Sequence, residues 1–536
     1  MPKLFVKTKN SNFSENSNSN FSVNFISDKS ILETLNRGKI YINSGCGGNG
    51  RCGLCKIEIK DQAAKVRAEI VNTPTKGEKR LLAEDEISQG IRLACHTIAY
   101  DDLNISMLNS AVTASWRDIK PEEYMNVSSQ TDISPCSSYN ISPTSSVLPK
   151  CRDKIFGAAV DLGTTHIRVT LWDMQKRVRL SGRFGVNPQI SFGSDVLTRI
   201  AAAAESEDIL STILELSQNT IRDEIRNMAV KLELNYSDIR HIVIVGNSSM
   251  LALLSGKNYK ELLMPQNWIK DIDISPDDPL QLSRSWGFSD NTCIELIEPI
   301  GGFVGSDIIA GSLAARLVES DIPSLLIDFG TNSEIALWDG ITLWITSAAG
   351  GPAFEKVGIY GSDIVDIIAE LLKNSIIKPN GRFTDKACGN NASFTVQPNS
   401  SAAGHQIGDI SITKRDIDMF QRAKAAVAAG VISVIKRAGV SVKDLKRVCI
   451  CGVFGNKLNV ENAQYLGLLP QQIEADKVEL CGNTALAGCE IMLFNPDRAA
   501  SVKQIKTRTK IINLSESSDF ENLFIQNLQL LPIRAD

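Results

Sequence analysis

The chain contains no apolar run that approaches the roughly 18 residues needed to span a bilayer. Its formal net charge is only −4, and so small an excess of one sign argues against a nucleic-acid surface or a polybasic membrane surface. Residues 1–7 also lack the apolar core of a secretory signal. We therefore expect a cytoplasmic protein with neither nucleic acid nor a membrane as a partner.

Histidine is scarce as well. The four histidines are scattered through 536 residues, and only His96 directly follows a cysteine. A Rieske iron–sulfur centre needs two histidines on one iron, so this class is excluded. In a cytoplasmic protein, the twelve cysteines are expected to be thiols or metal ligands rather than disulfides.

Three regions of different composition follow one another, and a chain of this length exceeds what one core can organise. Residues 1–100 form the first unit. Residues 101–152 are rich in serine and proline and lose apolar periodicity, which predicts a flexible linker. From residue 153 to residue 536 the pattern predicts an α/β domain.

The first unit contains a loop with three cysteines, Cys46, Cys52 and Cys55, in the spacing C-x5-C-x2-C, and a fourth cysteine, Cys95, follows. Thiolates are soft ligands for iron or zinc. Three close cysteines and one remote cysteine resemble a [2Fe–2S] ferredoxin loop, although the first gap of the plant-type spacing is one residue shorter.

Glycine crowds this loop, at Gly45, Gly47, Gly48, Gly50 and Gly53. A loop that wraps a cluster and aims its amides at sulfur needs close backbone approach and positive φ, which glycine allows. A structural zinc site is the alternative, but such sites more often have two C-x2-C pairs. The other eight cysteines are interpreted as small buried hydrophobes: Cys136, Cys151, Cys293, Cys388, Cys449, Cys451, Cys481 and Cys489.

Around the loop, residues 4–6 and 21–26 are predicted to be paired strands, residues 30–35 a capped helix, and residues 55–59 a returning strand. This is the β-grasp order that the ferredoxin resemblance implies. The short charged run at residues 76–80 is interpreted as a solvated face.

The α/β region contains one pattern twice. An apolar strand ends in DLGTT at residues 161–165 and continues into a strand that ends in Leu-Trp-Asp. The pattern recurs with DFGTN at residues 328–332 and the same ending. Two copies of one hairpin predict an internally duplicated fold, with halves at about 153–320 and 321–536.

These hairpins suit phosphate binding. The turn glycines, Gly163 and Gly330, open backbone amides toward an anion, and the adjacent threonine hydroxyls donate to phosphate oxygens. A carboxylate, Asp161 or Asp328, tolerates phosphate only with a cation between them, which implies Mg2+. The two hairpins resemble the phosphate loops of the actin/Hsp70/sugar kinase superfamily (ASKHA).

A third element follows in the order of that superfamily. An apolar strand at residues 448–451 runs into G-x-x-G, formed by Gly452 and Gly455 and followed by Asn456. Its glycines would let the backbone pack against adenosine. The element resembles the adenosine motif of the superfamily.

Further stretches resemble the reductive activators of corrinoid enzymes: IVGNSSM at 244–250, GGFVGSD at 301–307, SAAGGPAFE at 347–355, residues 412–424, and GNTA at 482–485. They occur in family order behind the cluster domain. The resemblance implies an α+β β-grasp ferredoxin domain joined to a duplicated α/β ASKHA ATPase domain. One departure is that SAAGGPAFE is followed almost directly by GSD, where the family usually has a longer segment.

The resemblance implies ATP-dependent reductive activation of a corrinoid protein, in which one electron passes from a [2Fe–2S] cluster to Co(II) and gives Co(I). The implied partners are a corrinoid protein, from a methyltransferase system or the corrinoid iron–sulfur protein, an upstream low-potential electron donor, and a second copy in a homodimer. Cys46, Cys52, Cys55 and Cys95 would hold the cluster. The implied catalytic residues are Asp161 and Asp328, which would position Mg2+ and water. The implied ATP contacts are Gly163, Thr164, Thr165, Gly330, Thr331, Asn332, Gly452, Gly455 and Asn456.

Two other classes stay open. One is an activase of a radical or dehydratase system, although such ASKHA proteins resemble carriers of a [4Fe–4S] cluster between subunits and have no ferredoxin domain. The other is a nucleotide-gated scaffold with a purely structural cluster. Two residues also keep more than one interpretation. Glu334 could orient water or be an exposed strand carboxylate. The segment 301–307, which ends at Asp307, could line the nucleotide cleft or a corrinoid-facing surface, or be a glycine-rich helix entry.

Overall fold

The structure, a computed structural model, describes residues 3–9, 18–25, 28–61, 69–109, 116–124, 155–319, 321–354, 361–384, 393–396 and 410–533. Much of the predicted linker and the segment 355–360 therefore lie outside the described residues. The chain divides into two compact units. The first comprises Met1–Arg117, Thr164–Ile167 and Phe184–Asp223, and the second comprises Asp118–Gly163, Arg168–Arg183 and Glu224–Asp536.

The first unit contains a five-stranded sheet with the order β2-β1-β5-β3-β4. Its strands are β1 (Lys3–Lys9), β2 (Asn18–Asn24), β3 (Lys56–Ile59), β4 (Ile91–Leu93) and β5 (Leu103–Met107). β1 pairs antiparallel with β2 and parallel with β5, while β3 is antiparallel to both β4 and β5. The predicted pair of strands and the β-grasp type of sheet are confirmed.

β5 extends the first unit beyond the boundary predicted at residue 100. Leu103, Ile105 and Met107 are buried, because alternate side chains of a strand point to the same face. The sheet thus includes residues that the prediction assigned to the linker. The structure also assigns a strand at β6 (Arg117–Asp118), which joins the next sheet.

Helix α1 (Ile31–Arg37) begins where the sequence predicts its cap. Ser30 Oγ accepts a hydrogen bond from the Glu33 amide at 3.2 Å, and the Glu33 carboxylate accepts one from the Ser30 amide at 3.0 Å. This reciprocal capping box satisfies two amides that have no partner inside the helix. The first unit also contains α3 (Lys76–Leu81) and α4 (Glu84–Ser88).

The interpretation of residues 76–80 as a solvated face was wrong for Glu78. This residue lies in the middle of α3 and has 0% exposure. It pairs with Arg92, which is only 4% exposed. A buried carboxylate requires such a partner, and a partner from a distant strand cannot be read from the local charge pattern.

Two six-stranded sheets follow, with the orders β11-β10-β7-β8-β9-β6 and β18-β17-β12-β13-β14-β19. Besides β6, the strands of the first are β7 (Phe156–Leu162), β8 (His166–Asp173), β9 (Val178–Val186), β10 (Ile239–Gly246) and β11 (Cys293–Leu296). Those of the second are β12 (Ser324–Phe329), β13 (Asn332–Trp338), β14 (Leu343–Ala349), β17 (Arg447–Gly452), β18 (Val478–Leu480) and β19 (Thr509–Ile511). Each sheet contains a predicted hairpin, β7–β8 or β12–β13, at the same place in its order. The predicted duplication is confirmed.

Strand β12 is buried on both faces, which explains its continuous apolar sequence. Leu325 and Ile327 join one hydrophobic core with α10 and α11, and Leu326 joins a second core on the other face. Asp328 is the next residue on the face of Leu326. The sequence alternation therefore turns this carboxylate toward the second core rather than toward solvent.

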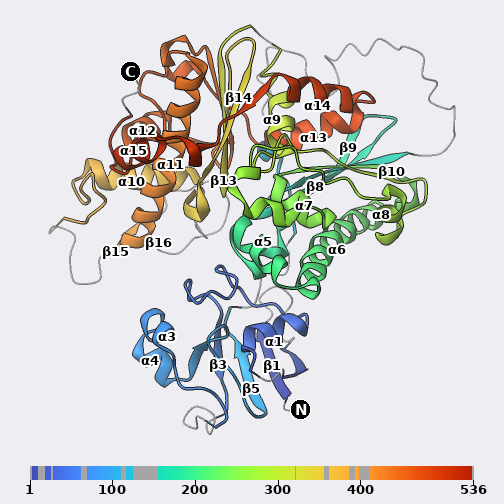
Figure 1. The fold of residues 1–536 in the computed structure, drawn as a ribbon, viewed down its shortest axis with the longest axis vertical. Coiled ribbons are helices and arrows are strands. Elements are labelled where there is room, and N and C mark those ends of the chain that lie inside the picture. The colour runs from blue at the N-terminus through green and yellow to red at the C-terminus, as the bar shows by residue number, and fades with distance from the viewer. Residues whose placement is uncertain are drawn as a thin grey trace. The chain divides into compact units, whose positions relative to one another are not determined.

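Helices cover these sheets in the second unit. α11 packs against β13 and β14, and α13 packs against α9, β7 and β10, as can be followed in Figure 1. The α-helices from residue 196 onward are α5 (Val196–Glu205), α6 (Glu207–Lys231), α7 (Ser248–Ser255), α8 (Pro279–Ser285), α9 (Ser306–Ala314), α10 (Gly361–Lys373), α11 (Lys414–Ala438), α12 (Val460–Leu466), α13 (Thr484–Phe494), α14 (Arg498–Thr507) and α15 (Phe520–Gln526). Of these, α5 belongs to the first unit, and α6 has residues in both units. A separate two-stranded sheet consists of β15 (Ser393–Val396) and β16 (Ile410–Thr413).

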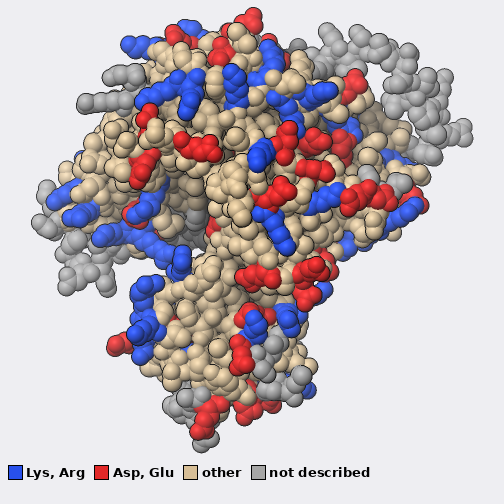
Figure 2. Space-filling model, in the orientation of Figure 1, with Lys and Arg blue, Asp and Glu red and all other residues tan. Residues whose placement is uncertain are grey.

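Charged side chains lie on the surface, and most of the described cysteines outside the cluster loop are buried. Basic and acidic side chains are interspersed on the face that Figure 2 shows. No described helix combines the length and hydropathy needed to cross a membrane. Cys449, Cys451, Cys481 and Cys489 are buried as predicted, but Cys293 is exposed at the first position of the edge strand β11. The other three cysteines of that group lie outside the described residues.

Candidate functional site

Three of the predicted cluster cysteines lie on a loop between α1 and β3, and Cys95 lies two residues after the end of β4. The loop aims backbone amides at sulfur. The Arg51 amide donates to Cys46 Sγ at 3.4 Å, and the Leu54 amide donates to Cys52 Sγ at 3.5 Å. Such contacts favour thiolate over thiol.

Glycine makes this loop conformation possible at four of the five predicted positions. Gly47, Gly48, Gly50 and Gly53 have φ values of 57°, 92°, 66° and 72°, a region that other residues seldom adopt. Gly45 is not among the residues with positive φ. The positive-φ part of the sequence argument is therefore correct for four glycines and wrong for Gly45, where an added Cβ would nevertheless lie 3.0 Å from Leu54 Cδ1.

The four thiols form two pairs. Cys55 Sγ and Cys95 Sγ lie 3.4 Å apart, and Cys46 and Cys52 share a side-chain hydrogen bond. The hydrogen bond with Cys95 lowers the pKa of the Cys55 thiol. Among the described residues, no three of these four sulfurs lie within 4.8 Å of one another.

Two separate pairs fit a binuclear cluster. A single tetrahedral zinc ion, with Zn–S bonds near 2.3 Å, would hold all four sulfurs within about 4 Å of one another. A [2Fe–2S] cluster instead takes two protein ligands on each iron. The thiol arrangement therefore favours the cluster over the zinc alternative.

The first hairpin places Asp161 inside the second unit, where it is 5% exposed. Arg168 Nη1 lies 3.3 Å from Asp161 Oδ2, and Asn483 Nδ2 donates to the same oxygen at 3.1 Å. Arg168 comes from β8 and Asn483 from the start of α13. These contacts fix the direction of the carboxylate and were missed from the sequence. Arg168 alternates in β8 with apolar residues, which was the available signal.

Three further carboxyl groups lie in this region: Glu334 is buried, and Asp307 and Asp328 are half-buried. Burial raises the pKa of Asp328 to about 7, and the charge of Asp161 contributes to this shift. The pKa of Asp307 rises to about 7 through burial and the charges of Asp161 and Asp328. Burial, Asp307 and Asp328 raise the pKa of Glu334, which is 5% exposed. The alternative of an exposed Glu334 was therefore wrong. Carboxyl groups that disfavour one another's charge would be stabilised by a divalent cation among their oxygens.

The strand register explains why these groups meet. Asp328 on β12 is opposite Glu334 on β13, and Cys451 on β17 is opposite Asp328 from the other side. Directly opposite residues point to the same face of a sheet. A sequence reader sees only that Glu334 lies six positions after Asp328, not that the turn brings them together.

The turn residues lie where the hairpin predictions place them. Gly163, Thr164 and Thr165 connect β7 to β8, and Thr164 is buried. In the second hairpin Gly330 and Thr331 connect β12 to β13, which begins at Asn332. The carbonyl of Thr331 accepts a hydrogen bond from the Gly351 amide at 2.6 Å, so the GGPAF stretch supports this turn.

The G-x-x-G element lies against the second hairpin. Gly452 has a φ of 70°, and a Cβ there would lie 2.2 Å from the Phe329 carbonyl oxygen and 2.3 Å from Asp328 Oδ1. Gly455 is equally close to the backbone of Gly482. Because Gly482 precedes Asn483, the partner of Asp161, the structure brings both hairpin aspartates and the glycine element together. Asn456 follows at an exposed position.

Family models match most of the chain. The model described as "2Fe-2S iron-sulfur cluster binding domain" matches residues 15–100, and "RACo middle region" matches residues 156–320. The model "C-terminal domain of RACo the ASKHA domain" matches residues 323–357 and 356–535. The two matched pieces meet just after SAAGGPAFE, where this sequence is shorter than the family pattern.

Curated relatives extend this likeness. The corrinoid activation enzyme RamQ of Eubacterium limosum is 31% identical over 423 residues, which are 70% of this chain and 70% of that protein. A Co(II) methylated amine-specific corrinoid protein reductase of Methanosarcina barkeri is 23% identical over 432 residues, 70% of this chain and 77% of that protein.

A solved structure supports the fold. That of a reductive activator for corrinoid, iron-sulfur protein covers 99% of this chain and 98% of its own, with a TM-score of 0.62 and 22% identity. The fold and the site thus define an iron–sulfur protein with an ASKHA domain. The chain belongs to the RACo-like family of reductive corrinoid activators.

Proposed function

We propose that this protein uses ATP to drive the reduction of a corrinoid protein from Co(II) to Co(I). The observation that carries the proposal is the presence, in one chain, of two thiol pairs suited to a [2Fe–2S] cluster and of a buried carboxylate group beside the nucleotide motif. The names of the two curated relatives, a corrinoid activation enzyme and a Co(II) corrinoid protein reductase, support the same function.

Cys46 and Cys52 would hold one iron, and Cys55 and Cys95 the other. A bound [2Fe–2S] cluster would supply one-electron chemistry, and the chain's amides would stabilise the charge on the thiolates. Co(I) formation is uphill for ordinary donors. A one-electron couple costs about 1.4 kcal/mol per 59 mV, so a gap of roughly 200 mV is on the order of 5 kcal/mol. Nucleotide binding and hydrolysis could offset that amount.

In the ATPase domain, Asp161 and Asp328 would hold Mg2+, in part through water, and would orient the attacking water. Arg168 and Asn483 keep Asp161 in place for this role. The turn amides near Gly163 and Gly330 would face the phosphates. Their neighbours Thr164, Thr165, Thr331 and Asn332 would donate to phosphate oxygens, and Gly452, Gly455 and Asn456 would contact adenosine.

One buried and one half-buried carboxyl group extend this assignment. Glu334 and Asp307, with raised pKa values, would accept hydrogen bonds from water bound to the cation. We further propose a cytoplasmic homodimer that receives electrons from a low-potential donor, as the family resemblance implies. The name of the relative from Methanosarcina barkeri favours a methyltransferase-type corrinoid protein as the first partner to test.

An anaerobic assay tests the function. The purified protein is reduced with titanium(III) citrate and mixed with a Co(II) corrinoid protein, and the Co(I) absorbance is followed with and without Mg-ATP. Co(I) that forms only with ATP is the expected result, and ADP is the matched control. Cluster reduction without ATP-dependent Co(I), across several corrinoid proteins, would overturn the proposal and favour a nucleotide-gated scaffold.

A further inference from the structure

Three buried cysteines outside the ferredoxin loop lie together in the second unit. Cys449 and Cys451 belong to β17, and Cys481 directly follows β18. These strands run parallel, with Cys449 opposite Glu479. Because residues two positions apart on a strand share one face, all four side chains lie on the same face of the sheet.

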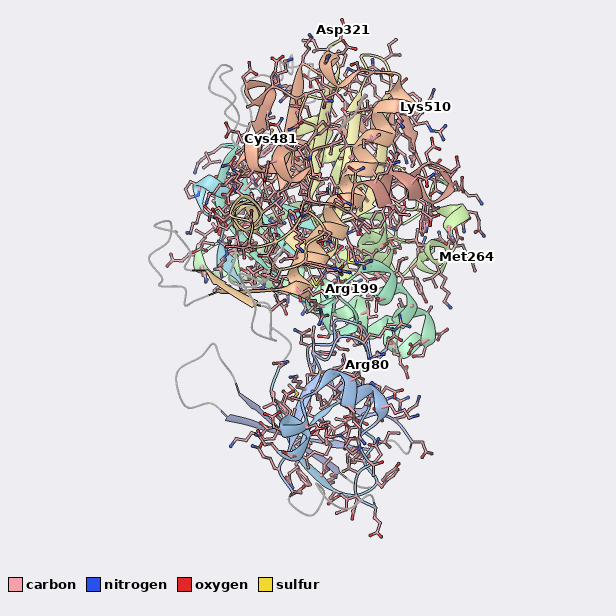
Figure 3. The ribbon with its side chains drawn as sticks, turned by 90° about the vertical axis from the view of Figure 1, so that its left-hand side faces the viewer. Arg80, Arg199, Met264, Asp321, Cys481 and Lys510 are labelled. Carbon is pink, nitrogen blue, oxygen red and sulfur yellow. The ribbon has the colours of Figure 1, made fainter. Side chains whose placement is uncertain are left out.

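Three of these side chains are close enough to bind the same metal ion. The sulfurs of Cys449 and Cys481 and a carboxylate oxygen of Glu479 all lie within 4.8 Å of one another. Over the described ranges, no other set of three cysteine, histidine or acidic side chains is so compact. Cys451 shares a hydrogen bond with Cys481, and none of the three cysteines is more than 2% exposed. Figure 3 labels Cys481 inside the second unit.

Glu479 is the solvent-exposed member of this group of side chains. Its side chain is 41% exposed and pairs with Arg447, whose Nε and Nη2 lie 2.9 Å and 2.7 Å from Oε2. Both contacts fall on Oε2, so Oε1 can coordinate a metal while the ion pair remains. The carboxylate is therefore a polar, solvent-exposed group beside the buried thiols.

We propose that Cys449, Cys481 and Glu479 bind one zinc ion, with a water molecule as the fourth ligand. Zinc accepts thiolate and carboxylate ligands and is four-coordinate in structural sites. Tetrahedral Zn–S bonds near 2.3 Å place ligand atoms about 3.8 Å apart, so a spacing within 4.8 Å requires side-chain rotation but no strand shift. Soft thiolates select zinc over Mg2+, which keeps this ion distinct from the proposed Mg2+ of ATP.

The zinc ion would join two strands immediately before the glycines of the nucleotide motif. Gly452 follows Cys451 and donates its amide hydrogen to the Gly482 carbonyl at 3.1 Å, and the Gly482 amide donates to Gly455 at 2.8 Å. Fixing β17 to β18 would therefore fix the spacing of these glycines. This consequence rests on the proposed function, whereas zinc binding itself does not.

Metal analysis of the full-length protein tests the site. One zinc ion per chain is expected in addition to the iron of the cluster, measured by plasma mass spectrometry. Cys481→Ser is expected to lose the zinc and keep the iron. Cys293→Ser alters an exposed cysteine outside the set and should keep both. Cys46→Ser should lose iron but keep zinc, and loss of zinc from this variant would overturn the proposal by placing zinc in the ferredoxin loop.

A second variant is needed because Cys481 is buried and Cys481→Ser could impair folding. Glu479→Gln, at a solvent-exposed position, is expected to lower zinc affinity at least about tenfold in chelator competition, since even an outer-shell partner contributes that much. In the absence of zinc, the thermal unfolding temperature of Glu479→Gln should equal that of the wild type. Zinc K-edge absorption should show two sulfur neighbours and two oxygen neighbours. Wild-type protein that stays zinc-free after dialysis against zinc would overturn the proposal, whatever the corrinoid assay gives.

Discussion

Arg92 and Glu78 form a buried, two-pronged ion pair inside the ferredoxin unit. Arg92 Nε donates to Glu78 Oε1 at 2.8 Å, and Nη2 donates to Oε2 at 3.0 Å. The amides of Thr75 and Leu93 also donate to this carboxylate. Burial acts to raise the pKa of Glu78, but the hydrogen bonds from Arg92 and the amides outweigh it and hold the pKa below its ordinary value. The pair thereby ties α3 to β4, the strand that leads to Cys95.

Glu78→Gln is therefore predicted to destabilise the ferredoxin unit by about 3–5 kcal/mol, the cost of leaving a buried charge without its partner. The measurement is urea denaturation followed through the visible absorbance of the bound cluster. Glu58→Gln removes a partly exposed ion pair with Lys60 and should cost less than about 1 kcal/mol. Equal losses in the two variants would contradict the role given to Arg92 and Glu78.

Asp328→Asn is predicted to lower the rate of ATP hydrolysis by about 100-fold or more. The substitution removes a charge that would hold the cation, and loss of one preorganised electrostatic group costs this much in other enzymes. Steady-state phosphate release measures the effect, and the iron content should stay at the wild-type level. The matched control is Asp418→Asn, which alters an exposed ion pair with Arg422 on α11. Unchanged hydrolysis in Asp328→Asn would remove Asp328 from the site.

Local sequence signals predicted those features of the fold and of the cluster loop that depend on residues close together in the sequence. The Ser30 cap, the cysteine spacing and the glycines of the cluster loop act over a few positions, and the structure shows the cap and positive φ at four of the five glycines. The repeated hairpin also predicted the duplicated sheets, because one strand–turn–strand unit generates the same pairing twice.

The remaining features depend on contacts between distant segments. Asn483 and Asp161 are 322 positions apart in the sequence, and Arg92 and Glu78 are 14 positions apart. Burial of Glu334 depends on its register with Asp328. A charged residue in a sequence carries no sign of whether a partner lies opposite it, so the exposed alternative for Glu334 and the solvated interpretation of residues 76–80 both failed.

Lys424 is predicted to make stability depend on pH. This lysine lies inside α11 with 0% exposure, and its Nζ donates to the Gln529 carbonyl at 2.6 Å. Burial lowers its pKa to about 7, whereas an unfolded lysine has a pKa near 10.4. Between these values the unfolded state holds a proton that the folded state has released. The free energy of unfolding should therefore rise with pH, by up to about 1.4 kcal/mol per pH unit, and this contribution is lost as pH falls toward 7.

Urea denaturation at pH 7, 8 and 9 measures this dependence. Lys424→Met removes the titrating group and should flatten the rise relative to wild type. Lys436→Met changes an exposed lysine of the same helix and should leave the slope unchanged. Parallel pH profiles for wild type and Lys424→Met would show that the buried amine stays protonated in the folded state.

Gly452→Ala and Gly439→Ala separate a local clash from backbone strain. Both glycines have positive φ, 70° and 68°, so each alanine costs about 1–2 kcal/mol from its backbone conformation alone. At Gly439, where α11 ends, an added methyl meets nothing within 4 Å. At Gly452 it meets the Phe329 carbonyl and Asp328 Oδ1, so β17 must move away from β12 beside the proposed nucleotide site.

Calorimetric titration with Mg-ATP should show at least about tenfold weaker binding for Gly452→Ala, equivalent to about 1.4 kcal/mol, and wild-type binding for Gly439→Ala. Equal affinities would mean that the glycine element lies away from the nucleotide, and the adenosine assignment would fail while the carboxylate site could still stand.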